Sequence, residues 1–415
     1  MVPRLLVIAQ WRARRRRQLV LALAFGTGLL VFLGLTAFLA GAQDSVEAPI
    51  RATTTGAMRV TDGNTEMAGG EAWPDARPAA AALADKSGGH VSLRWESSQL
   101  TVRRDDVEAW SGGVLLGIDP RDATEGRALA PYLAWGSTLE DDVVFHPGTG
   151  RALVPVLVGD KAAKRLNLTL GQDGAPDFDA VLLLTSGRLR EPGGLELPIT
   201  KDAVVVGVFD TGLEPFDRFA AFVPLQAARE LAGHGPADPT ANALVLRGGD
   251  AAAGAAWARG EGYRTEDAAR FARGFMGGVV VVLDAAAKAA AVLLGLVLLT
   301  WLGQETAAAV RADLAVLASL RAVGLPLASV SGTYGVVAGA SVMAGATVAG
   351  LLAALLPLVP GVHLEASGID ADIALAVPSW AWAALPVAVL AAAGLATAAA
   401  ARRLARSSIL DALRS

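Results

Sequence analysis

The sequence contains no cysteine among its 415 residues. Disulfide bonds, thiolate metal ligands and cysteine nucleophiles are therefore excluded. Charged residues are also scarce, at 18% of the chain, whereas hydrophobic residues make up 53%. A chain this apolar is typical of a membrane protein. Any large part of it outside the membrane must be stabilised by its own core, because cross-links are unavailable.

Several motifs of catalytic and nucleotide-binding proteins are missing as well. The sequence has no GxxxxGK[ST] phosphate loop, no GxSxG and no HExxH. Its four histidines stand far apart, at His90, His146, His234 and His363. Such isolated histidines do not predict a metal site. We therefore expect a chain that is not an enzyme and that holds no metal or cofactor itself.

Four apolar runs are long enough to cross a bilayer, since about 20 helical residues span about 30 Å. They occupy 19–40, 275–303, 327–358 and 379–401. The first follows the basic segment 1–18, whose arginine run ends at Arg17. Beside an apolar run this pattern favours a positive-inside anchor over a nucleic-acid contact. A cleaved signal peptide is the alternative for the first run, but its length exceeds a signal h-region and favours a retained anchor.

Loop charges predict how the chain crosses the membrane. The loop 359–378 lacks lysine and arginine, whereas basic residues return in 304–326 and in the tail 402–415. By the positive-inside rule, both termini and 304–326 lie in the cytoplasm, and 41–274 and 359–378 lie outside. Both termini on one side agree with four spans.

The segment 41–274 has the composition of a folded domain. We expect strands at Ala48–Val60 and His90–Arg103, together with short helices. In the second strand, apolar and polar residues alternate as in a half-buried strand, namely Val91, Leu93 and Trp95 against Ser92, Arg94 and Glu96. Strands and helices do not alternate strictly, which favours α+β. The predicted fold is a membrane protein with four transmembrane α-helices and a large α+β extracytoplasmic domain inserted between helices 1 and 2.

Two features of the later spans suggest specific contacts. Asp284 and Lys288 stand four residues apart in 275–303, the second span with its stalk. They form either an ion pair at the membrane interface or a buried functional pair. In the third span, Gly335 and Gly339 form a GxxxG motif, which predicts close packing on another helix.

The segment 304–326 is the one sizeable polar interruption in the apolar C-terminal third. Val310, Leu314 and Leu317 recur at helical spacing, and Gly324 then Pro326 supply a stop. This pattern predicts a short amphipathic helix between two spans. It is either an ordinary interfacial loop or a segment that receives a push from a cytoplasmic partner.

The order of these segments resembles the MacB/FtsX-like ABC transporter permease superfamily, and most closely its lipoprotein-releasing LolC/LolE branch. The resemblance rests on five segments: GVLLGIDP (113–120), VLVGDKAAKRLNLTLGQ (156–172), FDTGLEPFDRFAAFVPLQAARELAG (209–233), DLAVLASLRAVG (313–324) and ARRLARSSILDALR (401–414). Within the segment 209–233, Phe216 and Asp217 are expected to support the outer domain, as is Phe222.

This resemblance implies a non-catalytic permease subunit in a bacterial inner membrane, with its large domain in the periplasm. It would pair with a second permease, like or related, and with separate ABC ATP-binding subunits that carry ATP and Mg. The coupling helix would be 304–326, with Leu317 filling a groove of the ATPase and the arginines meeting acidic residues or lipid phosphates. The expected coupling residues are Arg311, Asp313, Leu317, Arg321 and Gly324.

The same resemblance implies that the cargo is a lipoprotein, released from the inner membrane and passed to a periplasmic carrier. Two alternatives remain open. One is an FtsX-like mechanotransmission subunit that regulates a cell-wall hydrolase. The other is a MacB-like exporter of a peptide, a drug or a lipid.

Overall fold

The computed structural model describes residues 15–62, 72–104, 107–171, 174–190, 196–235, 238–275, 278–366 and 369–406. The chain divides into two compact units. The helical unit comprises Met1–Gln43, Gly278–Val362 and Ile373–Ser415. The β-rich unit comprises Asp44–Gly277 and His363–Asp372.

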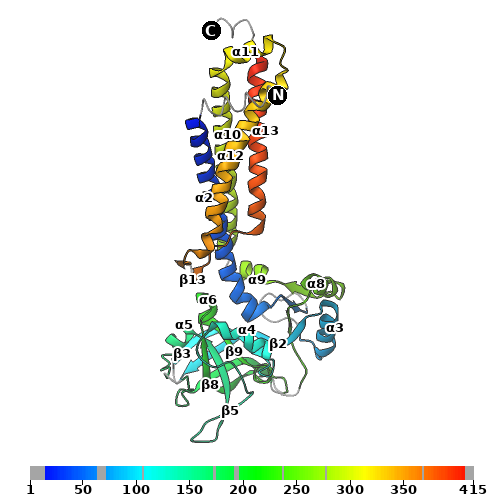
Figure 1. The fold of residues 1–415 in the computed structure, drawn as a ribbon. Helices are drawn as coiled ribbons and strands as arrows, with labels where there is room; N and C mark the ends of the chain where they lie inside the picture. Colours follow the sequence, from blue (N-terminus) through cyan, green and yellow to red (C-terminus); the bar gives the residue numbers. More distant parts are fainter. Residues whose placement is uncertain are drawn as a thin grey trace. The chain divides into compact units, whose positions relative to one another are not determined.

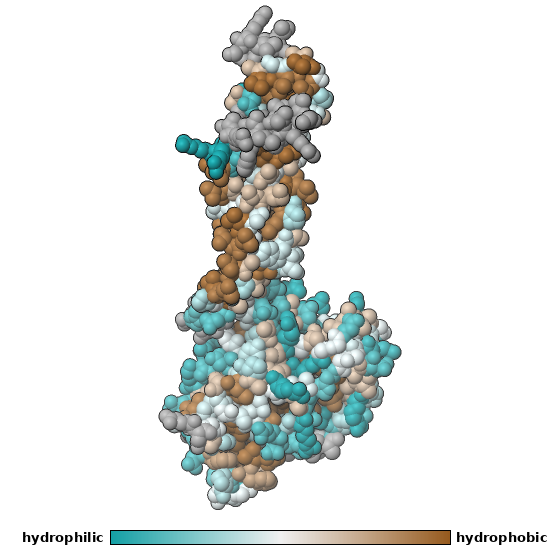
Figure 2. Space-filling model, viewed as in Figure 1, coloured by the Kyte–Doolittle hydropathy of each residue, from teal (hydrophilic) through white to brown (hydrophobic). Residues whose placement is uncertain are grey.

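Long helices dominate the helical unit (Figure 1). They are α2 (Arg15–Ile50), α10 (Gly278–Ala312), α12 (Leu327–Ala354) and α13 (Ser379–Arg406). Among the described residues, four helices are long and apolar enough to cross a membrane. Figure 2 shows apolar side chains over their surface and mainly polar ones over the β-rich unit. The shorter elements of this unit are α11 (Leu314–Ala322) and the 3-10 turn η3 (Leu356–Leu358), and the paired strands β12 (Val362–Ala366) and β13 (Ile369–Ile373) belong mostly to the β-rich unit.

All four long helices contribute to one apolar core. Phe25 of α2, Leu302 of α10, Val342 of α12 and Ala396 of α13 are buried in the same cluster. Small residues on α12 and α13 allow close approach, since alanine and glycine keep the backbones near each other. Dispersion contacts of this kind hold helices together where apolar surroundings remove the hydrophobic driving force.

Helix α10 is longer at its carboxyl end than the predicted second span. It continues past Gly303 to Ala312, because residues 304–312 are helix formers without glycine or proline. The expected strand at Ala48–Val60 is also wrong over most of its length. Helix α2 runs to Ile50 and continues as a π-helical turn, η1 (Arg51–Thr55). A strand begins only after Gly56, whose φ of +59° ends the helix.

The described part of the β-rich unit contains eleven strands in one sheet. They are β1 (Met58–Thr61), β2 (His90–Arg104), β3 (Val107–Ile118), β4 (Leu133–Gly136), β5 (Val144–Phe145), β6 (Ala152–Gly159), β7 (Leu182–Arg190), β8 (Glu196–Phe209), β9 (Ala220–Pro224), β10 (Ala243–Arg247) and β11 (Arg264–Glu266). The short helices are α3 (Arg77–Ser87), α4 (Ala123–Leu129), η2 (Ala130–Tyr132), α5 (Asp160–Arg165), α6 (Glu214–Phe219), α7 (Leu225–Leu231), α8 (Ala251–Gly260) and α9 (Ala268–Phe275).

Six of these strands close into a ring. The pairing runs from β2 through β3, β9, β6, β8 and β7 and returns to β2. Closure removes free edges within the ring, and its strands share a large apolar cluster with residues of α5 and α7. Strand β2 also extends beyond the ring, where its first residues pair with β10. There β10, β1 and β11 form a side sheet whose second core includes Leu83 of α3 and Ala258 of α8.

Candidate functional site

Helices α10 and α11 meet in a corner that contains the predicted coupling residues; we call residues 310–326 the α10–α11 corner. At Asp313 the chain leaves α10 with a tight turn, because its N–H donates to the carbonyl oxygen of Val310 at 3.2 Å. The carbonyl oxygen of Asp313 then accepts from the N–H of Leu317 at 2.9 Å, the first helical bond of α11. Gly324, with φ of +97°, follows the end of α11 and precedes α12.

Asp313 also ties the corner to α12. The hydroxyl of Tyr334 donates to Oδ2 of Asp313 at 2.7 Å. Tyr334 is nearly buried, at 6% exposure. A hydrogen bond to a carboxylate is stronger than one between neutral groups. A displacement of the corner would therefore be transmitted directly to α12.

Leu317 has a different environment from the one expected. Its side chain is only 2% exposed and packs with Val310, Val330, Tyr334 and Leu404. The expectation that Leu317 fills a groove of a partner is not met in this structure, because the chain's own helices already cover it. Leu317 instead stabilises the corner from within.

The opposite face of the corner is open. Val316 and Val323 are 59% and 84% exposed, and Arg311, near the end of α10, is exposed as well. We call these three residues the outer face of the corner. The side chain of Arg321 lies outside the described residues, so its predicted contact stays a prediction. Exposed valines can contact an apolar groove of a partner, and an exposed arginine can contact its acidic residues or lipid head groups.

A second polar contact lies close to the corner and was not predicted. Arg17 of α2 donates from Nε to Oε2 of Glu305 on α10 at 2.6 Å and from Nη2 to the Glu305 carbonyl oxygen at 3.0 Å. Both residues line a cavity of about 40 Å³ together with Asp313 and Tyr334. A cavity of this size with several polar side chains in its lining has room for one or a few waters. The sequence showed Arg17 only as the end of a basic run, which hid its pairing.

Glycines set the distances between the long helices. A Cβ on Gly335 would overlap Thr397 of α13, and one on Gly339 would lie 3.1 Å from the Cβ of Ala393. The predicted packing pair therefore faces α13. A second close approach was missed: a Cβ on Gly345 would overlap the backbone of α2 and lie 2.9 Å from the N of Gly26. These two glycines are 319 positions apart in sequence (345 − 26), so no local motif marks them.

The predicted pair Asp284 and Lys288 lies on α10. Lys288 is exposed, whereas the side chain of Asp284 lies outside the described residues. Their ion pair therefore stays a prediction.

The aromatic segment around 209–222 is structural, as expected. Phe216 and Phe222 are buried and pack with Phe209, with ring centroids 5.3–6.2 Å apart. Asp217 is fully buried, and its Oδ1 accepts from the N–H of Thr211 at 3.0 Å and from its hydroxyl at 2.7 Å. Burial raises the pKa of Asp217 to about 7, because its effect exceeds that of the hydrogen bonds from Thr211, which lower the pKa. The nearby Asp210 also raises it.

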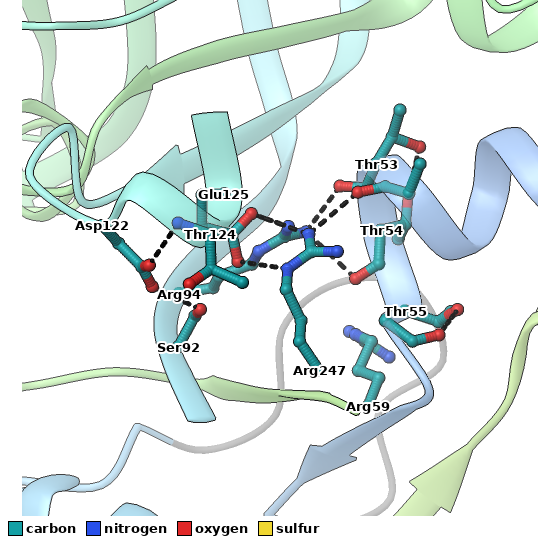
Figure 3. A network of polar contacts seen from close by, with 12 residues as sticks. Thr53, Thr54, Thr55, Arg59, Ser92, Arg94, Asp122, Thr124, Glu125 and Arg247 are labelled. Atoms are coloured by element: carbon teal, nitrogen blue, oxygen red, sulfur yellow. Dashed lines mark hydrogen bonds and ion pairs between the residues drawn. The ribbon is translucent and has the colours of Figure 1, made fainter. Parts of the chain in front are cut away.

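The β-rich unit contains a buried charged cluster that sequence reasoning missed (Figure 3). Arg94 of β2 and Arg247 of β10 both bind Glu125 of α4, at Nη2–Oε2 distances of 2.5 and 2.8 Å. Burial alone would raise the pKa of Glu125, but the two guanidinium groups outweigh it and hold the pKa below its ordinary value. Arg94 and Glu96 were expected on the solvent side of β2, and both are buried instead.

Within the described residues, no group of three or more histidine, cysteine, aspartate or glutamate side chains is placed to hold a metal ion. No protein-family model matches this chain, and no curated protein matches it.

Proposed function

We propose that this protein is the permease subunit of an ABC transporter of the MacB/FtsX-like superfamily, related most closely to the LolC/LolE branch. Four candidate membrane helices and a sizeable β-rich unit support the proposal. The five segments that resemble this branch support it further. In this proposal the β-rich unit is the periplasmic domain, inserted between the first and second transmembrane helices.

The observation that carries the proposal is the α10–α11 corner. It lies between two candidate spans, α10 and α12, and presents the exposed residues Val316 and Val323. The basic residues Arg311 and Arg321 support a cytoplasmic position for the corner by the positive-inside rule. A short helix in this position is where a separate ATP-binding subunit can dock, since the chain has no phosphate loop of its own.

In this mechanism the chain's residues convert nucleotide-driven movement of the partner into movement of its own helices. The ATPase contacts the outer face of the corner. Buried Leu317 makes the corner move as a unit, and the Asp313–Tyr334 hydrogen bond passes the displacement to α12. The Arg17–Glu305 pair links α10 to α2. Rigid packed elements of this kind transmit displacement rather than absorbing it.

The cargo in this proposal is a lipoprotein that the complex releases from the inner membrane to a soluble periplasmic carrier. A second copy of the permease, or a related chain, completes the dimer. Depletion of the protein in its host tests the cargo. The proposal expects lipoproteins to accumulate in the inner membrane, and correct sorting of outer-membrane lipoproteins would contradict this cargo. Altered cell-wall hydrolysis alone would favour the FtsX-like alternative.

Affinity purification of the full chain in mild detergent tests the subunit assignment. The proteins that purify with it are identified by mass spectrometry. The proposal expects an ATP-binding subunit with a GxxxxGK[ST] loop, and either a second permease or two copies of this chain. Purification of the chain without any ATP-binding protein, under conditions in which it remains folded, would overturn the proposal.

A further inference from the structure

Two arginines from neighbouring strands hold the carboxyl end of the first long helix. Helix α2 continues directly as the turn η1, whose carbonyl oxygens point toward β2 and β10 (Figure 3). Nη1 of Arg94 donates to the carbonyl oxygens of Thr53 at 2.6 Å and Thr54 at 3.0 Å. Nη2 of Arg247 donates to the carbonyl oxygen of Ala52 at 2.8 Å. Three consecutive carbonyls at the negative end of a helix thus receive cationic donors.

Glu125 fixes both arginines in this position. Its Oε2 accepts from Arg94 at 2.5 Å and from Arg247 at 2.8 Å, and its Oε1 accepts from Nε of Arg247 at 3.3 Å. Arg94 is fully buried and Glu125 is 1% exposed. Removal of one partner from a buried ion pair is strongly destabilising, because it leaves an uncompensated buried charge. The planar guanidinium groups add directionality, because their N–H groups are fixed relative to one another.

The helix that carries Glu125 is itself fastened to β2. Asp122 precedes α4, and its Oδ1 accepts from the N–H of Thr124 at 2.9 Å. Its Oδ2 accepts from the hydroxyl of Ser92 at 2.6 Å and lies 2.8 Å from Nε2 of His90. These hydrogen bonds hold the pKa of Asp122 at about 2 against the opposing effect of burial. Helix α4 therefore cannot shift without β2.

We propose that Arg94, Arg247 and Glu125 form a joint that makes the end of α2 move as one body with β2 and β10. Apolar packing alone permits a helix end to slide or rotate, whereas three carbonyls bound to two fixed guanidinium groups resist both. Because β2 also belongs to the closed ring, a displacement that reaches the joint reaches the ring. This inference depends on the proposed function only for what causes that displacement. Arg94, Arg247 and Glu125 are positioning residues.

The β-rich unit contains a matched control for this joint. Arg59 of β1 binds Glu96 of β2 and, at 2.9 Å, Glu266 of β11. Arg59 and Glu96 are as well buried as the joint, at 3% and 4% exposure. This control cluster has one arginine and two glutamates, whereas the joint has two arginines and one glutamate. The hydrogen bonds from Arg59 to these glutamates connect strands to one another. The arginines of the joint, in contrast, donate to the backbone carbonyl oxygens of residues 52–54 at the end of α2.

Each cluster can lose its surplus charge and keep a balanced pair. Arg247→Met leaves Arg94 paired with Glu125, and Glu266→Gln leaves Arg59 paired with Glu96. Both variants therefore avoid an unpaired buried charge, which would threaten folding. Only Arg247→Met removes a contact to the end of α2. Arg247→Lys, which keeps the charge but not the forked geometry, serves as a milder second variant.

Spin-label distances in the full chain test the joint. The chain has no cysteine, so Asp44→Cys on α2 and Ala256→Cys on α8 introduce the only two labels. Both positions are exposed and belong to the β-rich unit. We expect a narrow distance distribution in the doubly labelled parent and with Glu266→Gln. With Arg247→Met the distribution should be at least twofold wider, and with Arg247→Lys intermediate.

An unchanged width in Arg247→Met, or equal broadening by Glu266→Gln, would overturn the joint. This result does not depend on an ATPase partner, so it stands apart from the proposed function. A second measurement connects the joint with the proposed function. In the purified complex, addition of ATP should shift the 44–256 distance in Arg247→Met and leave it fixed in Glu266→Gln. If the widths behave as expected but no ATP-binding subunit is present, the joint holds and the proposed function fails.

Discussion

At the scale of single residues, Asp217 is the clearest case of a buried group that pH can change. Burial raises its pKa to about 7, whereas an unfolded aspartate has the ordinary value of 3.8. The folded state therefore binds a proton more tightly than the unfolded state. The resulting stabilisation is complete below the unfolded value and is lost as the pH rises toward and through 7.

We expect Asp217→Asn to remove this dependence on pH. The amide mimics the protonated carboxyl, keeping an acceptor for Thr211 and a donor for the nearby Asp210. A tenfold change in a protonation equilibrium corresponds to about 1.4 kcal/mol, so the parent loses on the order of a few kcal/mol between pH 4 and pH 8. The measurement is the midpoint of thermal unfolding of the full chain in detergent. If the midpoint depends on pH equally in the parent and in Asp217→Asn between pH 4 and pH 8, Asp217 is not the group responsible.

The hydrogen bond between Tyr334 and Asp313 is predicted to hold the α10–α11 corner. Tyr334→Phe removes the hydroxyl and keeps the ring, at a cost of about 1–3 kcal/mol for a bond to a charged group. Hydrogen exchange of residues 310–324 should accelerate about tenfold or more. Ser341→Ala is the control, because it removes a hydrogen bond between α12 and Gln18 of α2 instead. Equal acceleration of the corner by both variants would mean that Tyr334 has no specific role there.

The burial of the polar side chains on β2 could not be predicted from the local sequence. The alternation over His90–Glu96 predicts a strand, and that strand is present. It also suggested that Arg94 and Glu96 face solvent, yet both are buried by charged partners from distant segments. Glu125 lies 31 positions from Arg94, and Arg59 lies 37 positions from Glu96. A local pattern contains no information about such partners.

At the scale of elements, glycines determine how closely the long helices approach. Gly345→Ala is expected to force α12 away from α2, because its methyl group would overlap the carbonyl oxygen of Ala22. Overpacking of this kind costs about 1–3 kcal/mol. Gly332→Ala on the same helix meets nothing within 4 Å and is the matched control. The midpoint of thermal unfolding should fall for Gly345→Ala only, and a similar fall for both variants would contradict the close approach.

Helix lengths were harder to predict than helix positions. Hydropathy located all four long helices, because an apolar run of about 20 residues rarely forms anything but a membrane-spanning helix. It placed the end of α10 near Gly303, since polarity rises there, although the backbone stays helical to Ala312. It likewise missed the continuation of α2 through 41–50, because that stretch contains Gly41 and Pro49, which disfavour helix. Polarity reports the surroundings of a residue, whereas helix ends depend on capping and on residues such as Gly56.

At the scale of the whole molecule, the proposed function assigns one task to each part. The corner receives movement, the long helices carry it, and the joint passes it into the ring of strands. The sequence located the corner by its polarity and spacing. It did not reveal which face is open, because the burial of Leu317 depends on α12 and α13, whose contacts no short window of sequence contains.

Binding of an ATP-binding subunit to the outer face of the corner is the central claim. Val316→Asp places a charge on that face, and Val359→Asp makes the same change at an exposed valine beyond the other end of α12. Each variant is purified by an affinity tag, and the bound ATP-binding subunit is quantified by mass spectrometry. We predict at least a tenfold loss of that subunit with Val316→Asp and parental levels with Val359→Asp. Parental levels with Val316→Asp, in a protein that remains folded, would contradict the account.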